Sequence, residues 1–540
     1  MYRYVYEKNI NYSHDDALLY LGKHITYGQL FENINHMAEA FWKIGVRKGD
    51  FVFFLSITTP ELIYSIYALN RIGAVVNMLE PRNNVERVQG FLSGTKRKFV
   101  VILEPFWNKF GNMLMQENIE KIVLFSPVSS ASCSFRIAYS FKRPSFPQNE
   151  LGKVLKWNEF IGPKYDCDGE IDFYDEPSEK AIIVYTSGTT GIPKGAMLSD
   201  SAWNNVAEMS MLAGIGNGVR QDKFLLIMPP FIAYGILGIH AALAMGKQIV
   251  IIPQFKPELF HEYVLKHKPN HILGVPTHWE NLARCGKIKD LSFLKTAIAG
   301  GDKMSVETEE KLNAFFEQTG CTVKMKKGYG MTELCSAAVF SMNECNRKGS
   351  VGVPFIGNNV KVTDEYGNEL RTGEKGELCV SGPTLLTGYY GNDLETRNIF
   401  SEDSNGTKWV KTGDIAYIDE DGFVYIVDRK KRMIIRPDGH NVFPRIIENV
   451  ITSHPIVFRC VVVGKKDKNV TNGKWPVAFV VKDDEYNSDE ESLRKALNDL
   501  MHERLPERDK AEEIYFIDKI PLTQVGKEDY QLLERMAENF

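Results

Sequence analysis

A glycine- and hydroxyl-rich segment at residues 185–195 limits what this chain can do more than any other part of its sequence. It follows the apolar run at residues 181–184 directly and ends in Pro-Lys-Gly. Glycines let successive backbone N–H groups converge on an anion, while hydroxyls and a lysine add donors and positive charge. The segment, called the phosphate loop below, therefore predicts a polyphosphate site. Its binding residues are expected to be Thr186, Ser187, Gly188, Thr189, Thr190, Gly191 and Lys194.

The spacing of glycine and lysine in the phosphate loop differs from that of the Walker P-loop, which needs G-x-x-x-x-G-K-[ST]. A flexible Ser/Thr/Gly linker is the alternative interpretation. Linkers of that kind rarely lie directly after a buried strand, so we favour a binding loop.

The size and composition of the chain are typical of a globular protein with several domains. Its 540 residues exceed what one hydrophobic core usually organises. The formal net charge of −4 gives no reason to expect a nucleic-acid partner. The longest apolar stretch, residues 231–246, is shorter than the ~20 residues that span a bilayer, so we expect no integral membrane segment. Scattered cysteines and an N-terminus without an apolar signal region predict a cytoplasmic protein.

Apolar runs alternate with helical patterns along much of the chain. Helices are predicted from Thr26 and from Pro60, and residues 231–246 are expected to form a buried helix beside a ligand pocket. Such apolar strands, separated by helices, predict parallel sheets covered on both faces. Residues 126–178 are expected to be a surface excursion, and residues 349–427 a smaller β subdomain. The predicted strands are residues 51–55, 74–78, 99–103, 121–125, 248–252, 271–275 and 296–299.

A second candidate site lies at residues 328–333, downstream of a predicted strand and turn at residues 299–302. Two glycines permit a flat ligand to approach the backbone, and Tyr329 offers a stacking face. Glu333 supplies a carboxylate that can hold a metal bound to phosphate. Taken alone, this segment also fits a plain turn. Combined with the phosphate loop, it predicts a nucleotide site.

Together with Thr-Gly-Asp at residues 412–414 and a C-terminal segment that ends in Lys527, these segments resemble the motifs of the adenylate-forming superfamily. That family includes acyl-CoA and aryl-CoA ligases, amino-acid adenylation domains and firefly-type luciferases. The resemblance covers nearly the whole chain, in the family's order. It implies an acyl-CoA synthetase-like α/β fold, with a large N-terminal domain of two α/β subdomains plus a β subdomain at residues 1–428. A hinge at 429–433 and a small mobile α+β C-terminal domain at 434–540 are implied as well.

The resemblance also implies roles for single residues. Thr332 is expected on the α-phosphate and Glu333 on Mg²⁺. Asp414 is expected on the ribose together with Arg429, although an Asp that caps a turn is the alternative. Lys527 is expected to reach both the carboxylate and the phosphate during adenylation, beside Lys194, Thr332 and Glu333 as the catalytic set. The remaining nucleotide contacts are expected from Gly300, Gly301, Asp302, Gly328, Tyr329, Gly330 and Met331, and Lys431 is the expected hinge residue.

The implied reaction has two steps and uses ATP, Mg²⁺ and a thiol. A carboxylate first attacks the α-phosphate, anion against anion, and an ammonium with Mg²⁺ offsets the repulsion while pyrophosphate leaves. A thiol, expected to be that of CoA, then displaces AMP from the acyl-adenylate. Two alternatives stay open: a ligase that loads a carrier protein in trans, and a nucleotide-binding relative without turnover. Retention of Lys194, Glu333, Asp414 and Lys527 argues against the second alternative.

Two segments depart from the family's pattern. Ile232 stands where amino-acid-activating relatives carry Asp and many CoA ligases carry His. A substrate ammonium facing Ile232 would be buried without a partner, so we expect an apolar small-molecule carboxylic acid. The loop at residues 436–441, implied to help form the thiol tunnel, is one residue longer than the common spacing. The acid pocket is expected to be lined by Phe231, Ile232, Tyr234, Gly235, Ala299, Gly301 and Gly330.

Overall fold

The computed structural model divides into two compact units. The first comprises Met1–Asn359 and Val380–Val410, and the second comprises Val360–Cys379 and Lys411–Phe540. The division falls within the expected β subdomain, and the hinge at residues 429–433 stays a prediction. The structure describes residues 1–95, 97–141, 143, 152–162, 173, 177–186, 193–342, 345–466, 473–483, 489–521 and 528–540.

One largely parallel sheet of the first unit carries the phosphate loop. Among the described residues its strand order is β19-β9-β8-β4-β3-β5-β6-β7. The pairs from β8 to β7 are parallel, whereas β9 and β19 are antiparallel additions at one edge. The strands are β3 (Phe51–Leu55), β4 (Val75–Leu79), β5 (Lys98–Leu103), β6 (Ile122–Phe125), β7 (Val154–Lys156), β8 (Ile182–Thr186), β9 (Lys194–Leu198) and β19 (Gly388–Tyr389).

A second sheet of the same unit has the order β16-β15-β14-β13-β12-β10-β11-β1-β2. Its centre from β14 to β1 is parallel, and antiparallel strands close both edges. The strands are β1 (Asp16–Tyr20), β2 (Lys23–Thr26), β10 (Lys223–Leu226), β11 (Gln248–Ile251), β12 (His271–Gly274), β13 (Thr296–Gly300), β14 (Lys326–Tyr329), β15 (Val339–Phe340) and β16 (Val353–Pro354).

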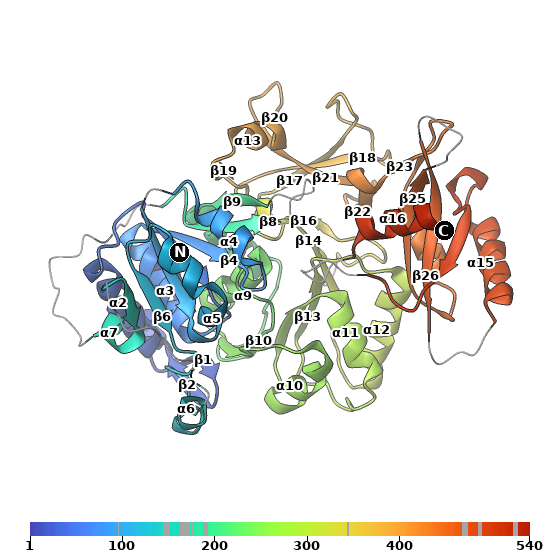
Figure 1. Ribbon diagram of the computed structural model, residues 1–540. Helices are drawn as coiled ribbons and strands as arrows, with labels where there is room; N and C mark the ends of the chain where they lie inside the picture. The colour runs from blue at the N-terminus through green and yellow to red at the C-terminus, as the bar shows by residue number, and fades with distance from the viewer. Residues whose placement is uncertain are drawn as a thin grey trace. The chain divides into compact units, whose positions relative to one another are not determined.

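Helices cover these sheets, and local sequence determines where they begin. Thr26 caps α2 (Tyr27–Lys43) in a capping box with Gln29, and Thr59 caps α3 (Pro60–Ile72), which has proline in its first turn. In Figure 1, α11 and α12 lie side by side next to β13. The other helices of the first unit are α1 (Tyr2–Asn9), α4 (Val85–Leu92), α5 (Trp107–Gln116), α6 (Cys133–Ser140), α7 (Trp157–Ile161), α8 (Asp200–Leu212), α9 (Ala233–Ala244), α10 (Phe260–His267), α11 (Pro276–Arg284), α12 (Val306–Gln318) and α13 (Asp393–Ile399).

The predicted strands and parallel pairing are confirmed, and one expectation is wrong in part. Residues 126–178 are not simply a surface excursion, because β7 joins the edge of the first sheet beside β6. Helix α7 follows it and buries Phe160, whose ring centroid lies 5.0 Å from that of Phe41. A strand of three residues with one buried side chain, Val154, carries too little pattern to be predicted.

The expected β subdomain is confirmed as a sheet of order β17-β18-β21-β20, with β22 paired to β21. Its strands are short except for β21, which continues through the Thr-Gly-Asp segment. The strands are β17 (Asn359–Thr363), β18 (Gly376–Ser381), β20 (Phe400–Glu402), β21 (Lys408–Ile418) and β22 (Val424–Arg429).

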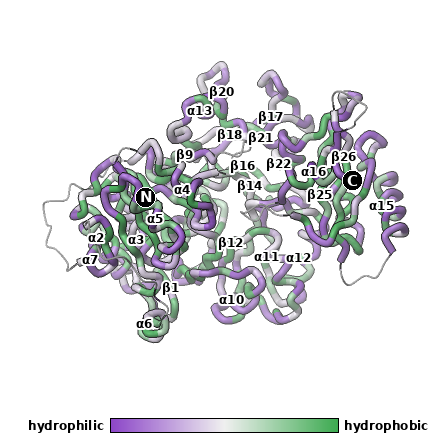
Figure 2. The backbone as a smooth tube through the Cα atoms, viewed as in Figure 1, coloured by the Kyte–Doolittle hydropathy of each residue, from purple (hydrophilic) through white to green (hydrophobic). Residues whose placement is uncertain are grey.

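The end of the second unit is a three-stranded sheet with helices on both faces. Val462 packs into one hydrophobic cluster with α14 and α15, whereas Val461 and Val463 pack into another with α16. Figure 2 shows the contrast between the largely hydrophilic α15 and the hydrophobic β26. The elements are β23 (Ile434–Ile435), β24 (Asn441–Val442), α14 (Pro444–Thr452), β25 (Val457–Lys466), β26 (Lys474–Lys482), α15 (Glu490–Arg504), β27 (Glu513–Phe516) and α16 (Tyr530–Asn539).

No helix in the described part of the chain is long and apolar enough to cross a membrane. The apolar stretch around α9 is instead a buried helix, as expected, with every residue from Gly235 to Ala244 in the interior.

Candidate functional site

The described ends of the phosphate loop form a β-hairpin. Strands β8 and β9 pair antiparallel, with Tyr185 opposite Gly195 and Thr186 opposite Lys194. The hairpin therefore places a hydroxyl and an ammonium on its last described pair. Ser187, Gly188, Thr189, Thr190 and Gly191 lie outside the described residues, so their roles stay predictions.

Lys194 lies in a cluster of polar side chains within the first unit. Its ammonium forms an ion pair with Glu395, in the first turn of α13, and lies 5.3 Å from the centre of the Tyr389 ring. The hydroxyl of Tyr389 donates a hydrogen bond of 2.7 Å to Oε1 of Glu333. The structure thus brings together two residues that the sequence predicts for phosphate and metal binding. Both approach the same tyrosine.

The environment keeps the Tyr389 hydroxyl protonated. Burial raises the pKa of Tyr389 above its ordinary value, and the negative charge of Glu333 raises it further. The side chain of Tyr389 is buried, and so is Glu333, which lies in the 3₁₀ turn η4 (Thr332–Leu334). A buried carboxylate needs hydrogen-bond donors, and Tyr389 supplies one.

The segment at residues 328–333 needs glycine for steric reasons. A Cβ on Gly330 would lie 2.0 Å from the carbonyl oxygen of Ser336, so the backbones on either side are in direct contact. A Cβ on Gly328 would meet only the Phe340 ring, at 3.5 Å. Cys335 and Ser336 have positive φ angles of 49° and 82°, which fold the chain back after η4.

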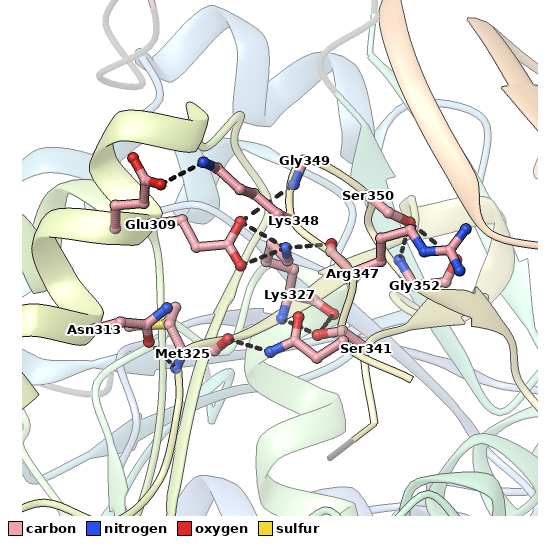
Figure 3. A network of polar contacts seen from close by, with 12 residues as sticks. Glu309, Asn313, Met325, Lys327, Ser341, Arg347, Lys348, Gly349, Ser350 and Gly352 are labelled. Carbon is pink, nitrogen blue, oxygen red and sulfur yellow. Dashed lines mark hydrogen bonds and ion pairs between the residues drawn. The ribbon is translucent and has the colours of Figure 1, made fainter. Parts of the chain in front are cut away.

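A buried polar network supports the start of this segment (Figure 3). The ammonium of Lys327 binds both carboxylate oxygens of Glu309, at 2.7 and 2.6 Å, and the carbonyl oxygen of Arg347 at 3.0 Å. Burial lowers the pKa of Lys327, and the Glu309 carboxylate opposes that shift. The network links β14 to α12 and to the chain around residue 347. It therefore anchors the residue that precedes Gly328.

The acid pocket is expected at the ends of β12 and β13 and the start of α9, and it stays a prediction. The Tyr234 side chain lies against β13, so that a Cβ added to Gly300 would be 3.4 Å from its hydroxyl oxygen. The same hydroxyl donates a hydrogen bond of 3.4 Å to the carbonyl oxygen of Gly274, at the end of β12. Gly301 has φ +80° and turns the chain out of the strand. Asp302 is exposed, and its carboxylate accepts the backbone N–H of Lys303 at 2.8 Å. Ala299 is buried beneath this surface.

Helix α9 begins later than the sequence suggests. Phe231 and Ile232 precede it, and Ile232 is the N-cap residue, without a side-chain capping bond. Gly235 allows the tight entry, because a Cβ there would lie 2.0 Å from the carbonyl oxygen of Pro229. Trp279 is a core residue, and its indole N–H donates to the carbonyl oxygen of Ile298 at 3.0 Å.

In the second unit, Asp414 and Arg429 are direct partners. They lie opposite each other on β21 and β22, with 2.7 Å between the guanidinium Nε and the carboxylate. The interpretation of Asp414 as a residue of a tight turn is wrong, since it lies inside an eleven-residue strand in which Gly413 has φ +72°. Lys431 is exposed in the 3₁₀ turn η5 (Lys430–Arg432), and Lys527 lies outside the described residues.

The lengthened loop at residues 436–441 connects β23 to β24. It closes through two backbone hydrogen bonds of 2.9 Å: the N–H of Arg436 donates to the carbonyl oxygen of His440, and the N–H of Gly439 donates to the carbonyl oxygen of Arg436. The His440 ring lies 2.6 Å from the Asp509 carboxylate, which fixes the loop to a neighbouring segment of its own unit.

The donors present fit a magnesium ion that arrives with a nucleotide. Within the described residues, no group of three or more His, Cys, Asp or Glu side chains could hold a metal by itself. Mg²⁺ is usually bound by one or two carboxylates plus substrate phosphates rather than by an all-protein cage. Glu333 is one such carboxylate, and it lies in the same cluster as Lys194.

Comparison with family models shows what this chain is. Residues 6–390 match the model of the AMP-binding enzyme, and residues 446–527 match that of the AMP-binding enzyme C-terminal domain. The chain belongs to the AMP-binding enzyme family. The resemblance inferred from the motifs is confirmed.

Relatives of this AMP-binding enzyme are CoA ligases by name. A probable 4-coumarate–CoA ligase 1 of Dictyostelium discoideum is 28% identical over 530 residues, covering 96% of this chain and 92% of its own. A long-chain-fatty-acid–CoA ligase of Bacillus subtilis strain 168 is 28% identical over 536 residues, covering 97% and 92%. The predicted enzyme class, an AMP-forming acid–thiol ligase, is therefore the class to which these relatives belong.

Solved structures confirm the fold of this AMP-binding enzyme. ATP-bound MatB from Rhodopseudomonas palustris has a TM-score of 0.80 at 22% identity, covering 100% of this chain and 99% of that one. The o-succinylbenzoate CoA synthetase MenE from Bacillus subtilis, in complex with AMP, has a TM-score of 0.77 at 23% identity, covering 98% of each chain. The acyl-CoA synthetase-like α/β class expected from the sequence is correct.

Sequence reasoning missed the two residues that complete the Lys194 cluster. Tyr389 belongs to a Gly-Tyr-Tyr segment that resembles the family's pattern, but the sequence of this segment does not indicate what its residues do. Glu395 carries no signal at all, because an acid in the first turn of a helix is common on any surface. Their contacts join segments that are far apart in the chain.

Proposed function

We propose that this chain is an AMP-forming ligase that joins a carboxylic acid to the thiol of CoA. The observation that carries the proposal is the convergence of Lys194 and Glu333 on Tyr389, in a chain that matches both models of the AMP-binding family. A lysine and a buried carboxylate that share one small cluster suit the polyphosphate of ATP and its cation.

The reaction proceeds in two balanced steps. The substrate carboxylate attacks the α-phosphate of ATP, the bond to the β-phosphate oxygen breaks, and pyrophosphate leaves from the phosphate loop. The CoA thiol then attacks the acyl carbonyl, loses its proton, and displaces AMP to form the thioester. When bound, Mg²⁺ neutralises phosphate charge, and Glu333 is the residue that would hold it.

Single residues have separate tasks in this scheme. Lys194 binds the departing pyrophosphate, and Thr332 binds the α-phosphate. Asp414 accepts the ribose hydroxyls, with Arg429 as its partner on the next strand. Lys527 stabilises the charge that builds up between carboxylate and phosphate during adenylation.

The substrate is an acid without an α-ammonium. Ile232 at the start of α9 offers no charge to such a group, and the neighbouring side chains of Phe231 and Tyr234 are aromatic. An aryl or acyl carboxylic acid satisfies these surroundings. We place the reaction in the cytoplasm, because the described cysteines are all free thiols.

ATP–pyrophosphate exchange across a panel of aryl, acyl and amino acids tests the adenylation step. Exchange with apolar acids and none with amino acids is expected. Exchange with no acid, in a protein that binds ATP, would favour a non-catalytic relative. Thioester formation with CoA compared with a holo-carrier protein separates the two thiols. Lys527→Ala should abolish exchange while thiolysis of a supplied acyl-adenylate continues.

A further inference from the structure

The side chain of Tyr389 connects two residues of the site that are distant in the sequence. It is 5% exposed, and its hydroxyl is 2.7 Å from Oε1 of Glu333, itself 6% exposed. The ammonium of Lys194 lies 5.3 Å from the centre of the same ring. One buried side chain therefore contacts the carboxylate expected to hold the cation and the lysine expected to hold the phosphate.

Backbone hydrogen bonds reinforce this connection. In the segment at residues 386–390, the N–H of Leu386 donates to the carbonyl oxygen of Glu333 at 2.8 Å. Four residues later, the N–H of Tyr390 donates to the carbonyl oxygen of Gly195, beside Lys194, also at 2.8 Å. The segment thus binds η4 at one end and the exit of the phosphate loop at the other.

The position of Tyr389 within this segment is itself fixed. It pairs with Ala196 across β19 and β9, and its backbone N–H donates to the Thr396 hydroxyl in α13 at 2.8 Å. These contacts fix the backbone of Tyr389, while burial of its side chain and the bond to Glu333 hold the hydroxyl before any ligand binds.

We propose that Tyr389 is a positioning residue: its hydroxyl orients the Glu333 carboxylate for the cation that accompanies ATP, and its ring holds Lys194 beside it. The inference rests on the proposed function, because it assigns Glu333 to that cation. Without this bond the carboxylate would more often adopt rotamers in which its oxygens do not face the cation. The hydroxyl removes that freedom by holding one of the two oxygens.

The neighbouring residue offers a matched control. Tyr390 also has a hydroxyl bonded to a side chain, at 3.0 Å from Thr95, and its ring packs on Phe51. Tyr390→Phe removes a hydroxyl from the same strand end without touching Glu333. Tyr389→Phe keeps the ring beneath Lys194 and removes only the bond to Glu333.

The test is calorimetric titration of the full-length protein with ATP at a series of Mg²⁺ concentrations and in EDTA. In Tyr389→Phe, the Mg²⁺ concentration that half-restores tight ATP binding should rise about tenfold, as expected for loss of a hydrogen bond to a charged group. ATP affinity in EDTA should stay within error of the wild type, whereas the melting temperature should fall, because the buried Glu333 carboxylate loses a hydrogen-bond donor. Tyr390→Phe should match the wild type in all three measurements.

A double-mutant cycle shows whether the hydroxyl acts through Glu333. In a Glu333→Gln background, adding Tyr389→Phe should change the Mg²⁺ requirement less than about twofold. A tenfold effect that persists in that background would overturn the inference. So would an unchanged Mg²⁺ requirement in Tyr389→Phe, or an equal loss of affinity in EDTA. Failure of the proposed function is distinguishable, because wild-type protein would then bind ATP without any response to Mg²⁺.

Discussion

Asp414 and Arg429 face each other on adjacent antiparallel strands, with 2.7 Å between carboxylate and guanidinium. Asp414 is buried, whereas the arginine side chain is 55% exposed. The carboxylate is therefore held in place by a partner that solvent can reach. We expect Asp414→Asn to weaken AMP binding by about tenfold to a hundredfold, because hydrogen bonds to a charged group are lost. Calorimetric titration with AMP measures this.

A matched control for the arginine lies in the same unit. Arg459 is 34% exposed and pairs at 3.0 Å with Glu528, whose side chain is 8% exposed. Arg429→Ala should weaken AMP binding severalfold, and Arg459→Ala should leave it unchanged. Equal effects of the two variants would show that Arg429 acts only through general stability.

The sequence predicts the elements of this fold better than the contacts of its site. Strand β3 lies at residues 51–55 as predicted, because five consecutive apolar residues between turns are buried best as a strand inside a parallel sheet. The N-terminus of α2 follows from Thr26 and Gln29, since a capping box is a local interaction. Such features depend on a few neighbouring residues.

The contacts of Tyr389 and Glu395 depend on the whole fold instead. Glu395 meets Lys194 because β19 adds to the edge of the first sheet and α13 follows it directly. No periodicity along the chain encodes that pairing. The charged run at residues 428–432 is a similar case. It suggests a solvated hinge, yet the Asp428 and Arg432 side chains are only 2% and 13% exposed.

Arg432 should be essential for the stability of the second unit. Its guanidinium pairs with Asp428 and Glu448, both almost fully buried, and lies 4.3 Å from the centre of the Tyr530 ring. Arg432→Ala removes the cation that these two buried carboxylates share, which should cost about 3–5 kcal/mol. Hydrogen exchange of the amides in α14 reports the loss locally. The nearby Lys430 is 45% exposed and pairs with Glu377. Lys430→Ala should lower the free energy of unfolding by less than about 1 kcal/mol.

Stability should also fall in mild acid because of a histidine in the first unit. Burial lowers the pKa of His278 to about 4, below its ordinary value of 6.5. Between these values the unfolded chain binds more protons, so stability is complete above pH 6.5 and is lost as the pH falls toward 4. The shift corresponds to roughly 3 kcal/mol at most. Thermal melts from pH 7 to 4 should show a shallower decline in His278→Gln, and an identical decline would contradict the assignment.

The two glycines around Tyr329 should differ sharply in their tolerance of a methyl group. In Gly330→Ala the new Cβ would lie 2.0 Å from the Ser336 carbonyl oxygen, and neither backbone can move without displacing η4. We expect a loss of about 3 kcal/mol or more, with ATP binding reduced at least as much. In Gly328→Ala the Cβ would meet the Phe340 ring at 3.5 Å, an ordinary contact, so both stability and binding should change little. The melting temperature measures the stability of each variant, and calorimetric titration measures its affinity for ATP. Because the two positions flank the same tyrosine and receive the same substitution, equal losses would mean that this segment responds to lost glycine flexibility rather than to the clash with Ser336.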